Sequence, residues 1–142
     1  HEIGHALIAK LVNGPTVSQV SILPRGQSLG QTFFDIEERY SHTKEDIEKQ
    51  IKICLGGRVA EKFITKTEST GAGDDLRKAT NLARSLVCSF GMSKFGSICV
   101  DYGSPEYQML SEETKKEAEE ALQQLDKAVD AKSFFRKLHN ER

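Results

Sequence analysis

Several features are scarce in this 142-residue sequence, and each absence excludes a class of protein. There is no tryptophan, and the three cysteines, Cys54, Cys88 and Cys99, are odd in number and form no Cys-x-x-Cys pair. We interpret them as reduced packing residues, because a disulfide framework or a cysteine metal site needs paired spacing. The net charge is only -1, which excludes the strongly basic surface typical of nucleic-acid-binding proteins.

Long apolar runs are absent as well. No stretch approaches the roughly 20 apolar residues of a membrane-spanning helix, and no secretory signal peptide is recognised. The length suits one domain, residues 1–142, with a hydrophobic core that needs no disulfides. We therefore expect this domain to be soluble. We also expect it to be a piece of a longer protein, because the sequence starts at a candidate metal ligand with no preceding helical turn.

The most informative stretch lies at the start, His1-Glu2-Ile3-Gly4-His5. In a helix His1 and His5 lie one turn apart on the same face, so both imidazoles can bind one divalent metal ion. Glu2 then lies beside the ion. The pattern is typical of zinc hydrolases, in which two histidines hold the metal, one position stays open for water, and a carboxylate accepts the water's proton. We expect this helix to end near Val12, before Asn13-Gly14-Pro15.

From Thr16 the pattern changes to a period of two, which predicts a strand, a turn at Pro24-Arg25-Gly26 and a returning strand over residues 29–36. Two interpretations of this hairpin stay open. It either covers one side of the core or offers an exposed edge that binds an extended peptide as an added strand.

Thr43-Lys44-Glu45-Asp46 is a capping-box pattern, and apolar residues follow it at helical spacing to about Ile64. Gly56-Gly57 falls inside this predicted helix. Because each glycine destabilises a helix interior by about 1 kcal/mol relative to alanine, the pair suggests a neighbouring helix packed against bare backbone. The histidine helix is the expected neighbour.

A polar, glycine-containing loop over residues 67–73 leads to Asp74-Asp75 and a third predicted helix that ends at Gly91. The positive end of the helix dipole is by itself enough to explain two carboxylates in a first helical turn. A site with two histidines also needs a third protein ligand, and either aspartate could supply it. Neighbours on a helix point about 100° apart, so only one of them can face the ion.

The remaining sequence shows weaker patterns. Residues 92–110 are predicted to form a loop with a short extended piece at residues 98–100, and a charged helix is expected from Ser111. We expect that helix to present a solvated face, and His42 and His139 to be surface residues.

These residues together resemble the peptidase domain of the FtsH family of membrane-anchored, ATP-dependent zinc metalloproteases. The resemblance covers residues 1 to about 96 and is carried by five ordered blocks: His1-Glu2-Ile3-Gly4-His5-Ala6, residues 20–26 with Leu29-Gly30, Leu55-Gly56-Gly57-Arg58-Val59-Ala60-Glu61, Ser69-Thr70-Gly71-Ala72 with Asp75-Leu76, and Phe90-Gly91-Met92-Ser93.

The resemblance implies zinc bound by His1, His5 and Asp75, with Glu2 as the general base. Asp75 is favoured over Asp74 because its distance from Ser69-Thr70-Gly71 matches the family pattern. The resemblance also implies that Val20, Ser21, Ile22 and Leu23 line the groove that aligns an unfolded or membrane-protein substrate. The expected fold is mainly α-helical, a helical metallopeptidase domain with one small antiparallel β-hairpin.

Further expectations concern the full-length protein. No Gly-x-x-x-x-Gly-Lys-Ser/Thr loop is present, so ATP would act only through an ATPase domain outside this sequence. A homo- or hetero-hexamer, anchored by upstream segments in a bacterial inner, mitochondrial inner or thylakoid membrane, is what the family implies. Two other functions stay open: a non-catalytic scaffold domain that retains the fold, and a protein-binding module with a structural zinc.

Overall fold

The computed structural model describes residues 1–35, 41–67, 69–86 and 104–109, together with residues 112, 113, 115, 116 and 120. It is mainly α-helical with one antiparallel hairpin, so the predicted fold class is confirmed. In chain order the elements are α1 (Glu2–Leu11), β1 (Val17–Ser21), β2 (Gln31–Phe34), α2 (Lys44–Thr65), the short 3-10 helix η1 (Thr70–Ala72), α3 (Gly73–Arg84) and α4 (Pro105–Gln108).

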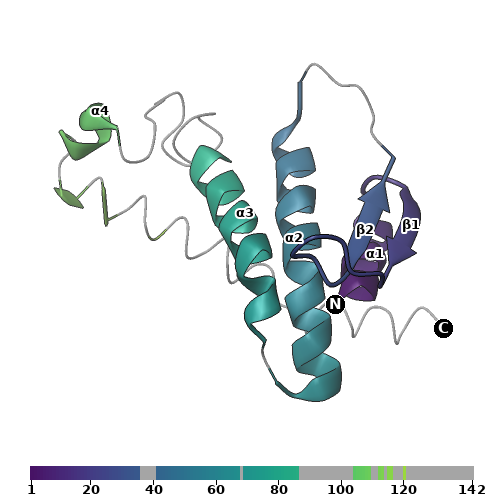
Figure 1. Ribbon diagram of the computed structural model, residues 1–142. Helices are drawn as coiled ribbons and strands as arrows, with labels where there is room; N and C mark the ends of the chain where they lie inside the picture. The colour runs from purple at the N-terminus through teal and green to yellow at the C-terminus, as the bar shows by residue number, and fades with distance from the viewer. Residues whose placement is uncertain are drawn as a thin grey trace.

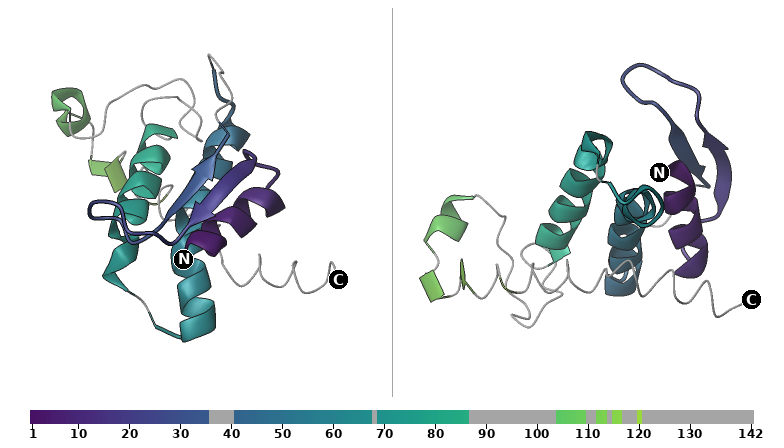
Figure 2. Two further views of the ribbon diagram at one scale, coloured as in Figure 1. Left: turned by 45° about the vertical axis from the view of Figure 1, so that its right-hand side comes forward. Right: turned by 90° about the horizontal axis from the view of Figure 1, so that it is seen from below.

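The long helix α2 lies between α1 and α3, and the hairpin packs on α1 (Figures 1 and 2). Ile8 and Ala9 of α1 form a buried cluster with Ile53 of α2, and Val17 and Phe34 of the hairpin pack against it. This cluster holds α1 between α2 and the hairpin, so the histidines at the start of α1 face α2.

Close glycine contacts set the distance between α1 and α2. A Cβ atom built on Gly4 would lie 2.7 Å from the Ala60 Cβ and against the carbonyl oxygen of Gly56, and one built on Gly56 would lie 2.7 Å from the Gly4 carbonyl oxygen. Real Cβ atoms do not approach other atoms so closely. The packing of the histidine helix against Gly56-Gly57 that the sequence predicts is therefore confirmed.

The ends of α1 and α2 agree with their predicted signals to within one residue. The Thr43 hydroxyl accepts a hydrogen bond from the Asp46 backbone N–H (3.1 Å), and the Thr43 N–H donates to the Asp46 carboxylate (2.9 Å), which is the predicted capping box. Asn13, the residue after the C-cap Val12, adopts a positive φ of 52°, as is common just beyond the end of a helix.

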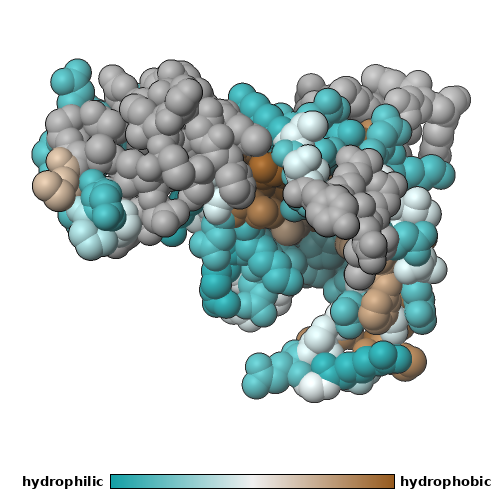
Figure 3. Space-filling view, turned by 90° about the horizontal axis from the view of Figure 1, so that it is seen from above, coloured by the Kyte–Doolittle hydropathy of each residue, from teal (hydrophilic) through white to brown (hydrophobic). Residues whose placement is uncertain are grey.

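The returning strand of the hairpin begins later than predicted, and the tip of the hairpin is exposed. Its turn closes through two hydrogen bonds between Arg25 and Ser28, and β2 begins at Gln31 rather than at residue 29. Ile22 and Leu29 near its tip are more than 80% exposed. The tip projects from the body as an arm that carries both hydrophilic and hydrophobic residues (Figure 3).

The C-terminal expectations are only partly testable. Pro105–Gln108 forms one helical turn where a loop was predicted, because proline at a first helical position carries no N–H that would need a partner. The extended piece at residues 98–100, the end of the third helix at Gly91, and His139 lie outside the described residues, as does most of the helix expected from Ser111. His42 is exposed, as predicted.

Candidate metal centre

The two histidines of α1 direct the same ring atom to one point. The Nδ1–H of His1 donates to Glu61 Oε1 (2.8 Å), and the Nδ1–H of His5 donates to the backbone carbonyl of Ile53 (2.6 Å). With the proton held on Nδ1, the lone pair of each Nε2 is available to a ligand. Hydrogen bonds from Nδ1 to a carboxylate or carbonyl are the usual support of metal-binding histidines.

Asp75, in the first turn of α3, completes the cluster. Its Oδ2 lies 2.9 Å from His1 Nε2 and 3.1 Å from His5 Nε2, and the three ligand atoms lie within 4.8 Å of one another. Asp74 is placed differently: its side chain is 78% exposed and pairs with Arg77 at 2.7 Å. Of the two adjacent aspartates, the structure therefore brings only Asp75 to the histidines.

The donor set fits a zinc ion. Two ligands bonded to zinc at about 2.0–2.1 Å with tetrahedral angles lie about 3.3 Å apart, close to the two separations from Asp75 Oδ2. Two imidazole lone pairs and a carboxylate oxygen at such distances repel one another unless a cation or a proton lies between them. Two nitrogens and one oxygen also leave a fourth position for water or substrate, as in catalytic zinc sites.

Gly57 keeps the centre open on the α2 side. A Cβ atom built on Gly57 would lie 2.6 Å from His5 Nε2 and 2.7 Å from His1 Nε2. Any side chain at this position would therefore occupy the space directly beside both ligand nitrogens. The second glycine of the pair thus borders the site, while Gly56 sets the helix spacing.

The protonation of His5 reflects the same arrangement. Burial of the ring lowers the pKa of His5, but the hydrogen bonds to Asp75 and Ile53 and the charges of Asp75 and Glu2 outweigh it, so the pKa lies above its ordinary value of 6.5. The groups around His5 therefore stabilise positive charge at this point, and a metal ion would supply such a charge.

Two residues that support the centre were not singled out by the sequence reasoning, Glu61 and Ser69. Glu61 uses one carboxylate oxygen for His1 and accepts a hydrogen bond from the Ser69 hydroxyl on the other (2.9 Å). The Ser69 oxygen also accepts from the Gly71 N–H at the start of η1, which leads directly into α3. Both lie in the blocks that carry the family resemblance, and that was the only available signal for them.

Glu2 lies beside the cluster, under the hairpin. The Thr32 hydroxyl on β2 lies 2.8 Å from Glu2 Oε2 and 2.9 Å from the Glu2 backbone oxygen. Gly30 passes so close that a Cβ atom there would lie 2.9 Å from Glu2 Cγ. The hairpin thus covers one side of the carboxylate, and Glu2 remains half-buried.

The other predicted site residues, Val20, Ser21, Ile22 and Leu23, lie at the end of β1 and just beyond it. Within the described part of the chain β1 pairs only with β2, so its other edge carries unpaired backbone groups. Val20, Ile22 and Leu23 are exposed, although they are apolar. The end of β1 and the two residues after it therefore present three accessible apolar side chains, with the half-buried Ser21 among them.

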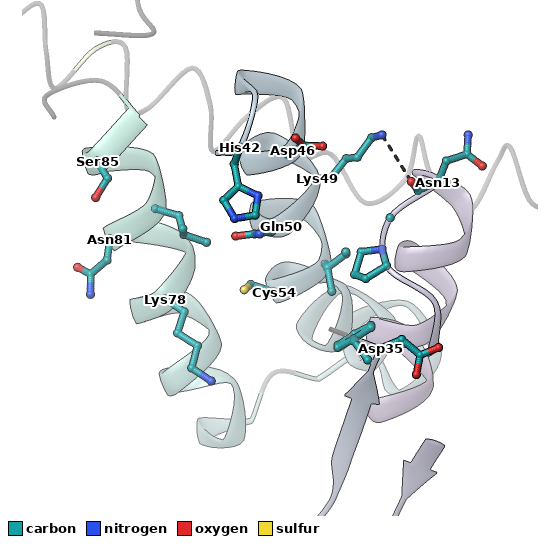
Figure 4. Close-up of a pocket in the computed structure, with 15 residues that line it drawn as sticks. Asn13, Asp35, His42, Asp46, Lys49, Gln50, Cys54, Lys78, Asn81 and Ser85 are labelled. Carbon is teal, nitrogen blue, oxygen red and sulfur yellow. Dashed lines mark hydrogen bonds between the residues drawn. The ribbon is translucent and has the colours of Figure 1, made fainter. Parts of the chain in front are cut away.

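A separate pocket opens between α2 and α3, and none of the three clustered residues lines it (Figure 4). Gln50 and Cys54 of α2 and Lys78 of α3 are among the residues that line it. Burial, reinforced by the Asp75 carboxylate, raises the pKa of the Cys54 thiol above its ordinary value. Cys54 is a free thiol, as the sequence predicts, whereas Cys88 and Cys99 lie outside the described residues.

A helix with two histidines one turn apart, a carboxylate between them and an acidic group from another helix is the arrangement that defines the His-Glu-x-x-His class of metallopeptidases. Comparison with known proteins identifies the peptidase family: the family model described as Peptidase family M41 matches residues 1–140. The chain belongs to this family.

The relatives agree with the assignment. The ATP-dependent zinc metalloprotease FtsH of Pseudothermotoga lettingae is 37% identical over an alignment of 158 residues, covering 99% of this chain and 25% of the relative. The proteins of the same name from Protochlamydia amoebophila and Methylococcus capsulatus are 38% and 48% identical, covering 91% and 66% of this chain and 15% of each relative. The chain thus spans a quarter or less of their length, and the resemblance to the FtsH family is confirmed.

No helix among the described residues is both long and apolar enough to cross a lipid bilayer.

Proposed function

We propose that this chain is a zinc-dependent endopeptidase domain in which His1, His5 and Asp75 bind the metal and Glu2 is the general base. The observation that carries the proposal is the convergence of two Nε2 lone pairs and one carboxylate oxygen, with separations of 2.9 and 3.1 Å from Asp75 Oδ2. The Nδ1 hydrogen bonds to Glu61 and Ile53 support it, because they orient both rings for a metal.

Zinc bound there would act as a Lewis acid on the scissile carbonyl and lower the pKa of the attacking water. The chain's own contribution to proton transfer is Glu2, whose carboxylate accepts a proton from that water and later passes it to the leaving nitrogen. His1, His5 and Asp75 would hold the zinc ion in place. The packing of α1 on α2 fixes the positions of the two histidine rings relative to α3.

The exposed edge at Val20, Ser21, Ile22 and Leu23 is proposed to align the substrate. An extended peptide can hydrogen-bond to an unpaired strand edge along its backbone without regard to sequence, while apolar side chains beside the edge contact its side chains. Such binding selects unfolded or locally extended segments, because a folded chain has few free strands to offer.

The wider role is also a proposal. The relatives' names, together with the small share of each relative that the chain spans, support the view that this domain is the proteolytic part of a longer ATP-dependent protease. In that protein ATP would be used by a separate ATPase domain. We propose a membrane-associated homo- or hetero-hexamer that degrades unfolded or membrane polypeptides.

The test of the catalytic assignment is Glu2→Gln, which keeps size and polarity but removes the proton acceptor. We expect zinc content near one per chain by elemental analysis and loss of at least about 100-fold in cleavage of an unfolded protein such as casein. Glu48→Gln, at a half-buried glutamate of α2 outside the cluster, is the matched control. Substantial cleavage by the zinc-loaded Glu2→Gln variant would remove Glu2 from the role of base.

A further inference from the structure

The hairpin contacts the side chain of Glu2, the residue proposed as the general base. The Thr32 hydroxyl lies at hydrogen-bond distance from Glu2 Oε2 (2.8 Å), and Gly30 passes against the Cγ of the same side chain. Both residues belong to the returning half of the hairpin, about 30 positions away in sequence. This carboxylate is therefore held by an element other than its own helix.

A glutamate in the first turn of a helix has three rotatable side-chain bonds and, when partly exposed, samples several rotamers. A general base must instead keep one oxygen within hydrogen-bond reach of the proton that it accepts, and a displacement of about 1 Å can lower a rate by about 100-fold. Among the described residues, the only hydrogen-bond donor that the structure places on the Glu2 carboxylate is Thr32.

Resting on the function proposed above, we propose that Thr32 is the positioning residue of the general base. Its hydroxyl donates to Glu2 Oε2, so the rotamer is fixed and Oε1 is left to exchange the proton with water. The hydroxyl has one hydrogen and two nearby acceptors; the carboxylate is favoured over the backbone oxygen because it is charged and slightly closer.

The register of the hairpin extends this role to the substrate. Thr32 pairs directly with Val20 across the two strands, and Val20 is part of the exposed edge proposed to align the peptide. An added strand on β1 would stiffen the hairpin at the same register position that holds Glu2. The base and the substrate edge therefore share one structural support.

The experiment uses the zinc-loaded chain with Thr32→Val, which removes the hydroxyl at nearly constant shape, and Thr32→Ser, which restores it. Ser18→Ala is the matched control, because Ser18 also makes a hydrogen bond within the hairpin, to the Phe33 carbonyl, but does not contact Glu2. We measure kcat and KM on an unstructured fluorogenic peptide, zinc per chain, the melting temperature, and the Glu2 rotamer by crystallography.

We expect Thr32→Val to lower kcat by about tenfold with KM, zinc content and melting temperature nearly unchanged, and Thr32→Ser to recover kcat to within about twofold. Glu2 should adopt one rotamer in the parent and in Thr32→Ser and several in Thr32→Val. Unchanged kcat in Thr32→Val, or a loss that follows zinc content or melting temperature and is not rescued by serine, would overturn the proposal.

The two proposals fail separately. A parent chain that binds zinc but cleaves nothing contradicts the proposed function, while the Glu2 rotamer still tests its dependence on Thr32. A single, unchanged rotamer in Thr32→Val contradicts the positioning role whatever the activity.

Discussion

At the scale of single residues, the candidate centre depends on which atoms are left free rather than on which residue types are present. His1 and His5 each use Nδ1 for a hydrogen bond and leave Nε2 for a metal. Asp74 and Asp75 are chemically identical neighbours, yet one pairs with Arg77 in solvent and the other lies against both rings. The difference is the rotation of about 100° between successive residues of α3.

The adjacent aspartates provide a test with an internal control. Asp75→Asn should weaken zinc binding by about 100-fold or more, because it removes a charged ligand oxygen, whereas Asp74→Asn should leave affinity within about twofold. Competition with a chromophoric chelator measures both. Equal losses in the two variants would mean that net charge, rather than ligation, controls binding.

At the scale of elements, the close crossing of α1 over α2 determines where His1 and His5 lie. Gly4 and Gly56 allow the two backbones to touch, and Gly57 leaves room beside the ligand nitrogens. Neither the Gly56 carbonyl nor the Ala60 Cβ can rotate away from an atom added at Gly4. The helices must therefore separate if that glycine is replaced, and His1 and His5 would move with α1.

Gly4→Ala tests this crossing. An alanine favours a helix interior by about 1 kcal/mol over glycine, but overpacking against the Gly56 backbone and the Ala60 Cβ should cost about 2–3 kcal/mol, the upper part of the usual range, and misplace the histidines. We therefore expect net destabilisation of about 1–2 kcal/mol by urea unfolding, together with weaker zinc binding. Gly73→Ala is the control, since an added Cβ there meets nothing within 4 Å. A Gly4→Ala chain as stable as the parent would show that the crossing can widen without loss.

At the scale of the whole molecule, the candidate centre joins elements that the sequence keeps far apart. His1 and Asp75 are 74 positions apart, and α2 lies between the helices that carry them. An ion bound to both would link α1 to α3 across α2. If zinc binds the folded chain but not the unfolded chain, the free energy of unfolding rises with the logarithm of the free zinc concentration.

Removal of zinc should accordingly lower the melting temperature. With free zinc at about 100 times its dissociation constant, the stabilisation lost on chelation is about 2.7 kcal/mol. Differential scanning fluorimetry with and without EDTA measures the shift, which Asp75→Asn should largely abolish and Asp74→Asn should retain. A shift of the same size in Asp75→Asn would place the stabilising ion elsewhere.

Much of this architecture was predictable because it is local. The spacing of His1 and His5, the Thr43 capping box and the stop at Asn13 each depend on one turn of helix, whose geometry is the same in every protein. Family resemblance extended the prediction to Asp75 and to the strand edge; their roles remain proposals.

What only the tertiary structure decided is how distant groups meet. The hydrogen bonds of Glu61 to His1 and Ser69, the orientation of Asp75, and the contact of Thr32 with Glu2 join positions 8 to 74 residues apart. No local pattern encodes them, because each depends on how α1, α2, α3 and the hairpin pack together. The sequence by itself determined which side chains could hold and use a metal; the packing determined which atoms face one another.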